Sequence, residues 1–158
     1  INQYDNLLIT RSFSKSHALA GLRVGYALAH ANLVEGLRRV KDSFNSYPVD
    51  AYAQCVATAA VSDSAWFADA SATVRENRAE LIAGLTKLDF SVLPSEANFV
   101  LASHPKHTGI ALTEYLKTQN ILVRSWSRDD LLPWVRITVG TKDQQARLFS
   151  AISEYLKD

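Results

Sequence analysis

The chain has 158 residues, of which 47% are apolar and 21% are charged, and its formal net charge is +1. This composition is typical of globular proteins with a sizeable core and argues against disorder. The near-neutral charge includes no basic block, so no nucleic-acid partner is expected. The single cysteine, Cys55, rules out an internal disulfide, and its alanine-rich surroundings predict a small buried residue.

No run of 18 apolar residues occurs, so no membrane-spanning segment is expected. The sequence also lacks a signal-peptide pattern, and a cytoplasmic location is therefore the default expectation. The chain begins at Ile1, contains no methionine and reaches a strand-like run within a few residues. We expect it to be a portion of a longer protein that is entered in the middle.

The first part of the chain predicts two strands and two helices. Residues 6–12 and 22–29 are short apolar runs of the kind that form buried strands. Asn32 followed by Glu35 is a capping pattern, which predicts a helix up to about Ser43. Asp50 is expected to cap a second helix that ends near residue 61. Two strands are too few to form a covered sheet by themselves.

Residues 64–88 form the longest periodic segment. An apolar stripe recurs at helical spacing, and four charged residues lie off it. The stripe comprises Phe67, Ala70, Val74, Leu81, Leu85 and Leu88, and the charged residues are Arg75, Glu76, Arg78 and Glu80. Because the segment holds no proline, we expect one continuous helix that links two bodies.

After residue 88 the pattern becomes β-β-α-β-β-α. Residues 90–103 give two short strands around Pro94, and a helix is expected from Thr108 to about Thr118. Residues 121–126 and 134–139 alternate as strands do. Thr141 and Gln144 predict a capping box. The last helix buries Leu148, Phe149, Ile152, Tyr155 and Leu156. Segregated strands and helices favour an α+β domain.

A loop with unusual chemistry follows the first strand, within the segment SFSKSHALAGLRVGY at residues 12–26. A lysine amine is a nucleophile when deprotonated, and Arg23 offers a guanidinium fork that matches phosphate oxygens. Ser12 and Ser14 add hydroxyl groups beside Lys15. An aldehyde that carries a phosphate, such as pyridoxal phosphate, suits this set because it forms a Schiff base with lysine. On residue types alone, however, most loops of this composition are simply solvated.

The same segment resembles the cofactor-lysine signature of fold-type I pyridoxal-phosphate aminotransferases of class I/II, in particular the histidinol-phosphate aminotransferase branch. The serine before the lysine, LAGLR at the same offset and the following GY carry the resemblance. It implies that Lys15 binds the cofactor covalently and that Ser12, Ser14 and Arg23 hold its phosphate. His17 stands at a variable position of the family and receives no role.

Two arginines stand in the middle of predicted strands, Arg124 in ILVRSW and Arg136 in WVRITVGT. A lone strand arginine usually points to solvent. These two strands are joined by a short connection and are expected to pair, which would bring two guanidiniums together unless an anion lies between them.

The resemblance supplies such anions. WVRITVGT resembles the strand whose arginine binds the substrate α-carboxylate in these aminotransferases, which implies that role for Arg136. ILVR resembles the strand whose arginine helps bind the distal phosphate of the substrate, which implies that role for Arg124. SEANFVL resembles the segment before a strand of the small domain, and Asn98 is expected near the substrate.

The resemblance covers the chain in order and implies an α/β fold of fold-type I. Residues 1–62 would be the C-terminal part of the large cofactor domain, and residues 63–158 the linking helix and the small α+β domain. The implied activity is transfer of an amine between an amino acid or histidinol phosphate and a 2-oxo acid such as 2-oxoglutarate, in histidine biosynthesis. The complete enzyme would be a homodimer, and this portion is expected to be inactive without the upstream residues.

Alternatives stay open at this stage. A phosphothreonine-type decarboxylase would share the lysine loop and the arginine pair, and a non-catalytic association domain is a third interpretation. His104 and His107, three residues apart, would need further ligands to bind a metal, so no metal is expected. Asp129 and Asp130 are adjacent carboxylates in a turn, which favours solvation over catalysis.

Overall fold

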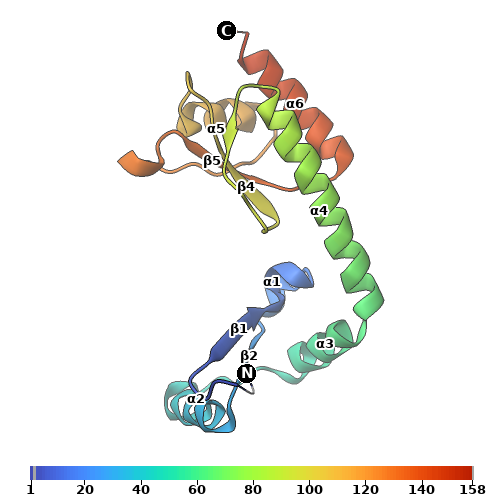
Figure 1. Ribbon diagram of the computed structural model, residues 1–158, viewed down its shortest axis with the longest axis vertical. Coiled ribbons are helices and arrows are strands. Elements are labelled where there is room, and N and C mark those ends of the chain that lie inside the picture. Colours follow the sequence, from blue (N-terminus) through green and yellow to red (C-terminus); the bar gives the residue numbers. More distant parts are fainter. Residues whose placement is uncertain (2, 158) are drawn as a thin grey trace. The chain divides into compact units, whose positions relative to one another are not determined.

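The structure is a computed structural model that describes residues 1 and 3–157. It divides into two compact units, Ile1–Asp69 and Ala70–Asp158, which we call unit 1 and unit 2 and describe separately. Figure 1 labels their helices and strands and colours the chain along the sequence.

Unit 1 is built on a two-stranded antiparallel sheet, β1 (Leu8–Ser12) with β2 (Gly25–Ala29). A short helix α1 (Phe13–Ser16) and a 3₁₀ turn (Ala20–Leu22) connect the strands. Two helices follow, α2 (Ala31–Phe44) and α3 (Ala51–Ser62). The two predicted strands and two predicted helices are therefore all present, but the expected burial of the strands is wrong, because neither β1 nor β2 contains a buried residue.

The helix starts in unit 1 follow local capping chemistry. Asp50 caps α3 as predicted, and its Oδ1 accepts a hydrogen bond from the Ala53 amide at 2.8 Å. The predicted cap of α2 is wrong, because that helix begins after His30, whose Nδ1 accepts from the Asn32 amide at 3.4 Å. Cys55 is exposed rather than buried, since only the small side chains of Ala53 and Ala57 on α3 are buried.

Helix α4 (Ser64–Thr86) is continuous over 23 residues, as the periodicity predicts. Its apolar stripe is used unevenly, because Leu81 and Leu85 are fully buried whereas Phe67 is 39% exposed. Leu81 and Leu85 belong to unit 2, whereas Phe67 belongs to unit 1. Within the part of the chain that the structure describes, no helix is long and apolar enough to cross a membrane.

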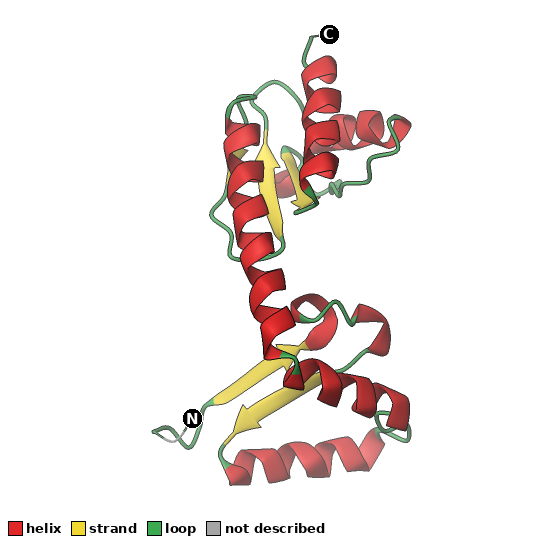
Figure 2. Ribbon diagram, turned by 90° about the vertical axis from the view of Figure 1, so that its right-hand side faces the viewer, coloured by secondary structure: helices red, strands yellow, loops and turns green. Residues whose placement is uncertain are grey.

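Unit 2 contains a three-stranded antiparallel sheet in the order β3 (Ser91–Val92), β4 (Phe99–Ser103) and β5 (Trp134–Thr138). The sheet lies beside α4 and α6 (Lys142–Tyr155) in Figures 1 and 2, and α5 (Gly109–Thr118) completes the unit. A single core joins one face of the sheet to the helices. Its buried members are Leu81, Leu85, Phe90, Val100, Ala102, Leu112, Leu116, Val135, Ile137, Leu148 and Ile152.

One predicted strand of unit 2 is almost absent. Residues 121–126 contribute only an isolated bridge, in which Arg124 pairs with Arg136. The Ile121 amide donates to the Leu116 carbonyl at 2.9 Å, so the segment begins by closing the end of α5. Ile121 and Val123 pack against the core whereas Leu122 is 81% exposed, so the alternation reflects one inward face even though the regular strand pairing is absent. The other predicted elements of unit 2 are present, including the capping box of Thr141 and Gln144.

A row of aromatic rings runs through unit 2 from the residue before β3, through the loop after β4 and the end of helix α6, to helix α5. Neighbouring ring centroids lie between 4.7 and 5.0 Å apart. The row comprises, in order, Phe90, His104, His107, Tyr155 and Tyr115. Burial among these rings, helped by the nearby His107 and Lys106, lowers the pKa of His104, although Asp89 opposes the effect.

This environment predicts a pH-dependent stability of unit 2. Because the folded state holds His104 neutral more strongly than the unfolded chain does, protonation favours unfolding. The free energy of unfolding should therefore fall as pH drops below the ordinary histidine pKa of 6.5. Urea unfolding at about pH 7.5 and about pH 5 measures this difference. His104→Phe, which keeps a ring but cannot titrate, should reduce the difference, and an unchanged difference would contradict the assignment.

Candidate active site

The lysine loop is held by the sheet of unit 1. Ser12, the last residue of β1, pairs directly with Gly25, the first residue of β2. A Cβ atom at Gly25 would lie 2.7 Å from the Arg11 carbonyl oxygen, so the two strands approach too closely for any larger residue. Phe13 is 4% exposed, and its amide donates to the Val24 carbonyl at 3.2 Å. The loop of residues 13–24 is thus closed at its base and anchored by one buried ring.

Inside this frame the serines organise a single helical turn. The Ser14 amide donates to Ser12 Oγ at 3.1 Å, and Ser16 Oγ donates to the Ser12 carbonyl at 2.9 Å. Ser12 therefore caps α1, and the resulting turn presents Lys15 at the surface. Among the described residues, the Lys15 amine has no hydrogen bond or ion pair, so it is available to a ligand.

Arg23 closes the same loop in a left-handed conformation, with φ of 55°. Its Nη1 donates to the Ala20 carbonyl at 3.3 Å, and its remaining donors have no partner within residues 1 and 3–157. Ala18 is also left-handed, with φ of 56°. Such a conformation costs a residue other than glycine about 1–2 kcal/mol, and strain of this kind is often found at functional sites.

His17 has contacts that its position in the sequence did not predict. Its ring stacks on Phe67 with centroids 5.0 Å apart and on Trp66 with centroids 6.4 Å apart. Phe13 lies on the ring as well, at a centroid distance of 5.1 Å. The aromatic pair at the start of α4 thus contacts the residue two positions after Lys15.

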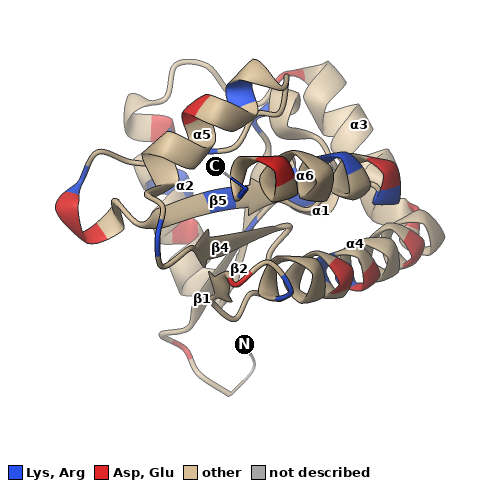
Figure 3. Ribbon diagram, turned by 90° about the horizontal axis from the view of Figure 1, so that it is seen from above, with Lys and Arg blue, Asp and Glu red and all other residues tan. Residues whose placement is uncertain are grey.

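The two strand arginines of unit 2 are direct neighbours. Arg124 and Arg136 exchange both backbone hydrogen bonds, at 3.1 and 2.7 Å. Residues opposite each other in an antiparallel pair project to the same face, with Cβ atoms about 4.5–5.5 Å apart. Val135 and Ile137 point to the core, so Arg136 projects from the other face of the sheet, and β5 carries a basic segment in Figure 3. The predicted approach of the two residues is therefore present.

Each arginine rests on an aromatic ring rather than on a carboxylate. The guanidinium of Arg136 lies 5.2 Å from the centroid of Phe99, and that of Arg124 lies 5.6 Å from Trp126. Neither makes an ion pair with any residue that the structure describes. Asn98 directly precedes Phe99, and the Val139 amide donates to its carbonyl at 2.9 Å. The three predicted residues Asn98, Arg124 and Arg136 therefore lie on or next to the paired strands of one sheet.

This arrangement provides two groups of unused donors, one in each unit. In unit 1, an amine, serine hydroxyls and a guanidinium share one short loop, which fits an aldehyde that carries a phosphate. In unit 2, two guanidiniums on one face fit one or two anionic groups of a ligand. The residue types present are therefore those that a pyridoxal-phosphate site and an anionic substrate would require.

Arg78 is a buried polar residue whose environment the sequence did not reveal. Its position off the apolar stripe of α4 predicted a surface charge, yet the residue is 8% exposed. Its guanidinium donates to the Ala97 carbonyl at 3.0 Å and pairs with Glu96. These contacts join residues 18 and 19 positions apart, so no helical spacing could have indicated them.

Comparison with known proteins identifies the family. The sequence model of the family "Aminotransferase class I and II" matches residues 1–152, which is nearly the whole chain. The chain therefore belongs to the class I and II aminotransferase family, as the lysine segment suggested.

Individual relatives agree with this assignment. The histidinol-phosphate aminotransferase of Acetobacter pasteurianus is 50% identical over 99% of this chain, which spans 44% of that protein. The structure of a histidinol-phosphate aminotransferase from Sinorhizobium meliloti in complex with pyridoxal-5'-phosphate superposes with a TM-score of 0.81. That match covers 97% of this chain and 42% of that one, and its identity of 22% supports the fold only.

A third similar protein is described as a decarboxylase and not as an aminotransferase. The L-threonine-O-3-phosphate decarboxylase of Porphyromonas gingivalis superposes with a TM-score of 0.82 at 27% identity. That match covers the whole of this chain and 49% of the decarboxylase. The chain thus spans a little under half the length of these relatives.

The left-handed conformation of Ala18 predicts that glycine substitutions at two nearby alanines change the stability of the loop in opposite directions. Ala18→Gly should stabilise the loop, by up to about 1 kcal/mol, because glycine adopts a positive φ without strain. Ala20→Gly, in the 3₁₀ turn, should destabilise it by up to about 1 kcal/mol, because glycine loses more backbone entropy there. Amide hydrogen exchange of residues 12–25 measures both effects. Equal signs for the two variants would contradict the assigned backbone conformations.

Proposed function

We propose that this chain is the C-terminal portion of a pyridoxal-phosphate-dependent aminotransferase. The proposed reaction transfers an amine between histidinol phosphate, or a related amino donor, and a 2-oxo acid such as 2-oxoglutarate. The name of the Acetobacter pasteurianus relative, at 50% identity, supports the donor class. Because the chain spans 44% of that relative, the activity is assigned to the complete enzyme and not to this portion acting by itself.

The observation that carries the proposal is the lysine loop. Lys15 lies on a serine-capped turn, and Arg23 returns to the same loop; within the described residues, the Lys15 amine and all but one of the Arg23 donors lack a partner. A solvated surface loop needs neither the buried Phe13 anchor nor two left-handed residues. The family assignment supports a cofactor-binding role for this loop.

Each residue of the loop has a distinct proposed task. Lys15 would hold the cofactor through its amine and, once released by the amino donor, would move a proton at the donor α-carbon. Ser12, Ser14 and Arg23 would bind the phosphate group and thereby fix the distance of the ring from Lys15. The cofactor supplies an electron sink for the α-carbon, whereas the loop supplies position and charge.

The arginines of unit 2 are proposed to bind the donor. Arg136 would bind the α-carboxylate, because it is half-buried on the sheet and has no carboxylate partner among the described residues. Arg124, which is exposed beside it, would bind a distal phosphate. Asn98 directly precedes β4 and would contact the same ligand. Two cations on one face repel each other, and anionic groups of a donor would relieve that repulsion.

The wider setting is also a proposal. Residues 1–62 would complete the large cofactor domain, and residues 63–158 would form the linking helix and small domain. A homodimer is proposed for the complete enzyme, together with a cytoplasmic location and a place in histidine biosynthesis. Small-molecule donors and 2-oxo acids would be its ligands, and neither nucleic acid nor membrane would be a partner.

A decarboxylase is the second candidate. The Porphyromonas gingivalis decarboxylase shares the fold over the whole chain at 27% identity, and its named substrate also combines a carboxylate with a phosphate. Two arginines on one face would suit either donor. Release of carbon dioxide, as opposed to formation of a new amino acid from 2-oxoglutarate, separates the two activities in one assay.

Arg136 gives a direct test in a chimera in which this chain replaces the segment that it matches in the Acetobacter pasteurianus enzyme. Loss of a bidentate charged contact removes about 1.5–3 kcal/mol, so Arg136→Ala should raise KM for every amino donor by about 10- to 150-fold. Steady-state kinetics with histidinol phosphate and with an uncharged donor measure this. KM values within about twofold of the unchanged chimera would reject the assignment.

Arg124→Ala in the same chimera is the matched variant, since it removes the neighbouring guanidinium on the same face. It should raise KM for histidinol phosphate by about tenfold or more and leave an uncharged donor almost unaffected. Equal losses for both donors would count against a distal phosphate site at Arg124.

The chain by itself is expected to be a poor cofactor binder. Mixing it with pyridoxal phosphate, reducing with borohydride and mapping the adducts by mass spectrometry should give no stoichiometric adduct confined to Lys15. The chimera treated in the same way should give one. A stoichiometric Lys15 adduct on the isolated chain, with measurable transamination, would show that these residues suffice without the rest of the enzyme.

A further inference from the structure

Two consecutive residues of α4 hold the segment that leads into β4 and the segment that follows β5, which lie side by side at one end of the sheet in unit 2. Arg78 contacts the turn before β4, where its guanidinium donates to the Ala97 carbonyl at 3.0 Å and pairs with Glu96. Asn77 contacts the segment after β5, where its Nδ2 donates to the Gly140 carbonyl at 3.0 Å. Both residues are less than one tenth exposed.

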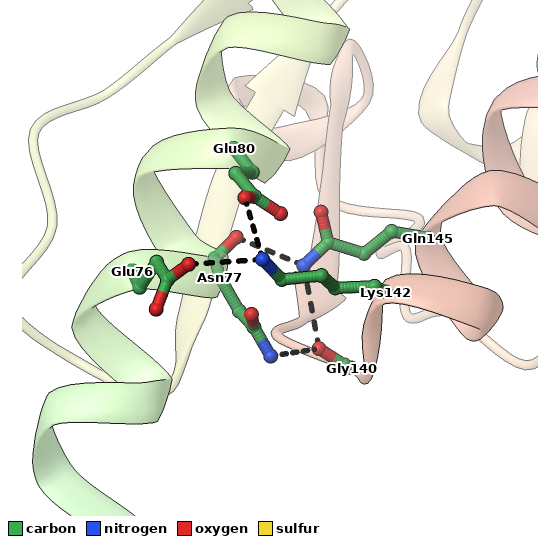
Figure 4. A network of polar contacts seen from close by, with 6 residues as sticks. All are labelled: Glu76, Asn77, Glu80, Gly140, Lys142 and Gln145. Carbon is green, nitrogen blue, oxygen red and sulfur yellow. Dashed lines mark hydrogen bonds and ion pairs between the residues drawn. The ribbon is translucent and has the colours of Figure 1, made fainter.

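Gln145 on α6 reinforces the second contact, as Figure 4 shows. Its Nε2 donates to the Asn77 carbonyl at 2.8 Å and to the Gly140 carbonyl at 3.3 Å. Two carbonyl acceptors fix which end of the amide faces them, and Oε1 is left buried without a partner in the described chain. A buried acceptor without a partner costs free energy. Gln145 keeps this orientation because only its Nε2 group can donate to the two carbonyls.

The segments that α4 holds are joined to each other by the residues proposed to bind the donor. Asn98 directly follows Ala97, and its carbonyl accepts from the Val139 amide at 2.9 Å, next to Gly140. Phe99 then pairs with Thr138, two residues after Arg136, and its ring carries the Arg136 guanidinium. The contacts of α4 therefore involve Ala97, the residue before Asn98, and Gly140, which lies four residues after Arg136.

We infer that Arg78 is a positioning residue for the end of the sheet that is proposed to bind the donor. Its hydrogen bond to the Ala97 carbonyl fixes the position of Asn98, the next residue in the chain. This inference rests on the proposed function, in which Asn98 and Arg136 contact the donor. Asn77 performs the matching task at Gly140. Neither residue touches the donor, so both act by fixing where the first residue of β4 and the last residues of β5 lie.

The geometry explains why an arginine stands at this position. A guanidinium can donate to a carbonyl and a carboxylate at once in a fixed plane, whereas a lysine amine is a single flexible point charge. The side chain of Glu96 is 93% exposed, and surface ion pairs contribute little. The bond to the half-buried Ala97 carbonyl is therefore the contact that restrains the turn.

Hydrogen exchange on the intact 158-residue chain tests the restraint without reference to any activity. Arg78→Leu should raise the exchange rate of residues 95–99 by about tenfold or more. Arg78→Lys, which keeps the charge and is less disruptive to folding, should raise it by a smaller factor. Arg75→Leu, an exposed arginine one turn earlier on α4, is the matched control and should leave the rate unchanged. Glu96→Gln should also have little effect.

Kinetics in the chimera separate positioning from simple structural support. Arg78→Lys should raise KM for the amino donor severalfold and leave kcat and the thermal midpoint nearly unchanged. Unchanged exchange at residues 95–99, or a loss of kcat with no change in KM, would overturn the inference. An active chimera that is insensitive to Arg78→Lys rejects the positioning role and leaves the proposed function standing. A chimera that lacks transamination rejects the proposed function and the positioning role with it, whereas the exchange rates still report whether Arg78 holds the turn.

Discussion

The register of β4 against β5 is the constraint on which most of unit 2 depends. Leu101 lies opposite Arg136, and this alignment directs Val100, Ala102, Val135 and Ile137 together into the core. A shift by one residue would exchange the two faces of a strand, so that Arg136 would enter the core and Ile137 would meet solvent. The core thus fixes the face from which Arg136 projects. The position of the proposed carboxylate anchor is in this sense a consequence of apolar packing on the opposite face.

The polar residues of both units differ in how far their hydrogen-bonding capacity is used. Asn77 and Arg78 donate to backbone carbonyls and are buried, so they stabilise one arrangement of unit 2. Lys15 and Arg136 lack such partners among the described residues. Donors without a protein partner remain available to an anionic ligand. The distinction separates the residues that build the site from those proposed to act in it.

Unit 1 is less self-sufficient than unit 2. Its sheet has only two strands, and a two-stranded sheet is marginally stable in water. Helix α2 exposes an apolar stripe, with Leu33, Leu37, Val40 and Phe44 between 36% and 76% exposed. Surfaces of this kind usually pack against further protein. The relatives are more than twice as long as this chain, which gives the proposal of a larger cofactor domain a physical motive.

The sequence by itself determined the local features of this protein. Helical periodicity predicted the continuous α4, side-chain oxygens at Asp50 and Thr141 predicted helix starts, and the segment around Lys15 predicted the family, because each depends on residues close in the chain. Only the tertiary structure decided the burial of Arg78, the contact of His17 with the start of α4 and the reduction of residues 121–126 to a single bridge. Each of these depends on which distant backbone or ring lies nearby. Spacing along the sequence carries no information about such neighbours, and a charged side chain on a helix looks the same in the sequence whether water or a buried carbonyl receives its hydrogen bonds.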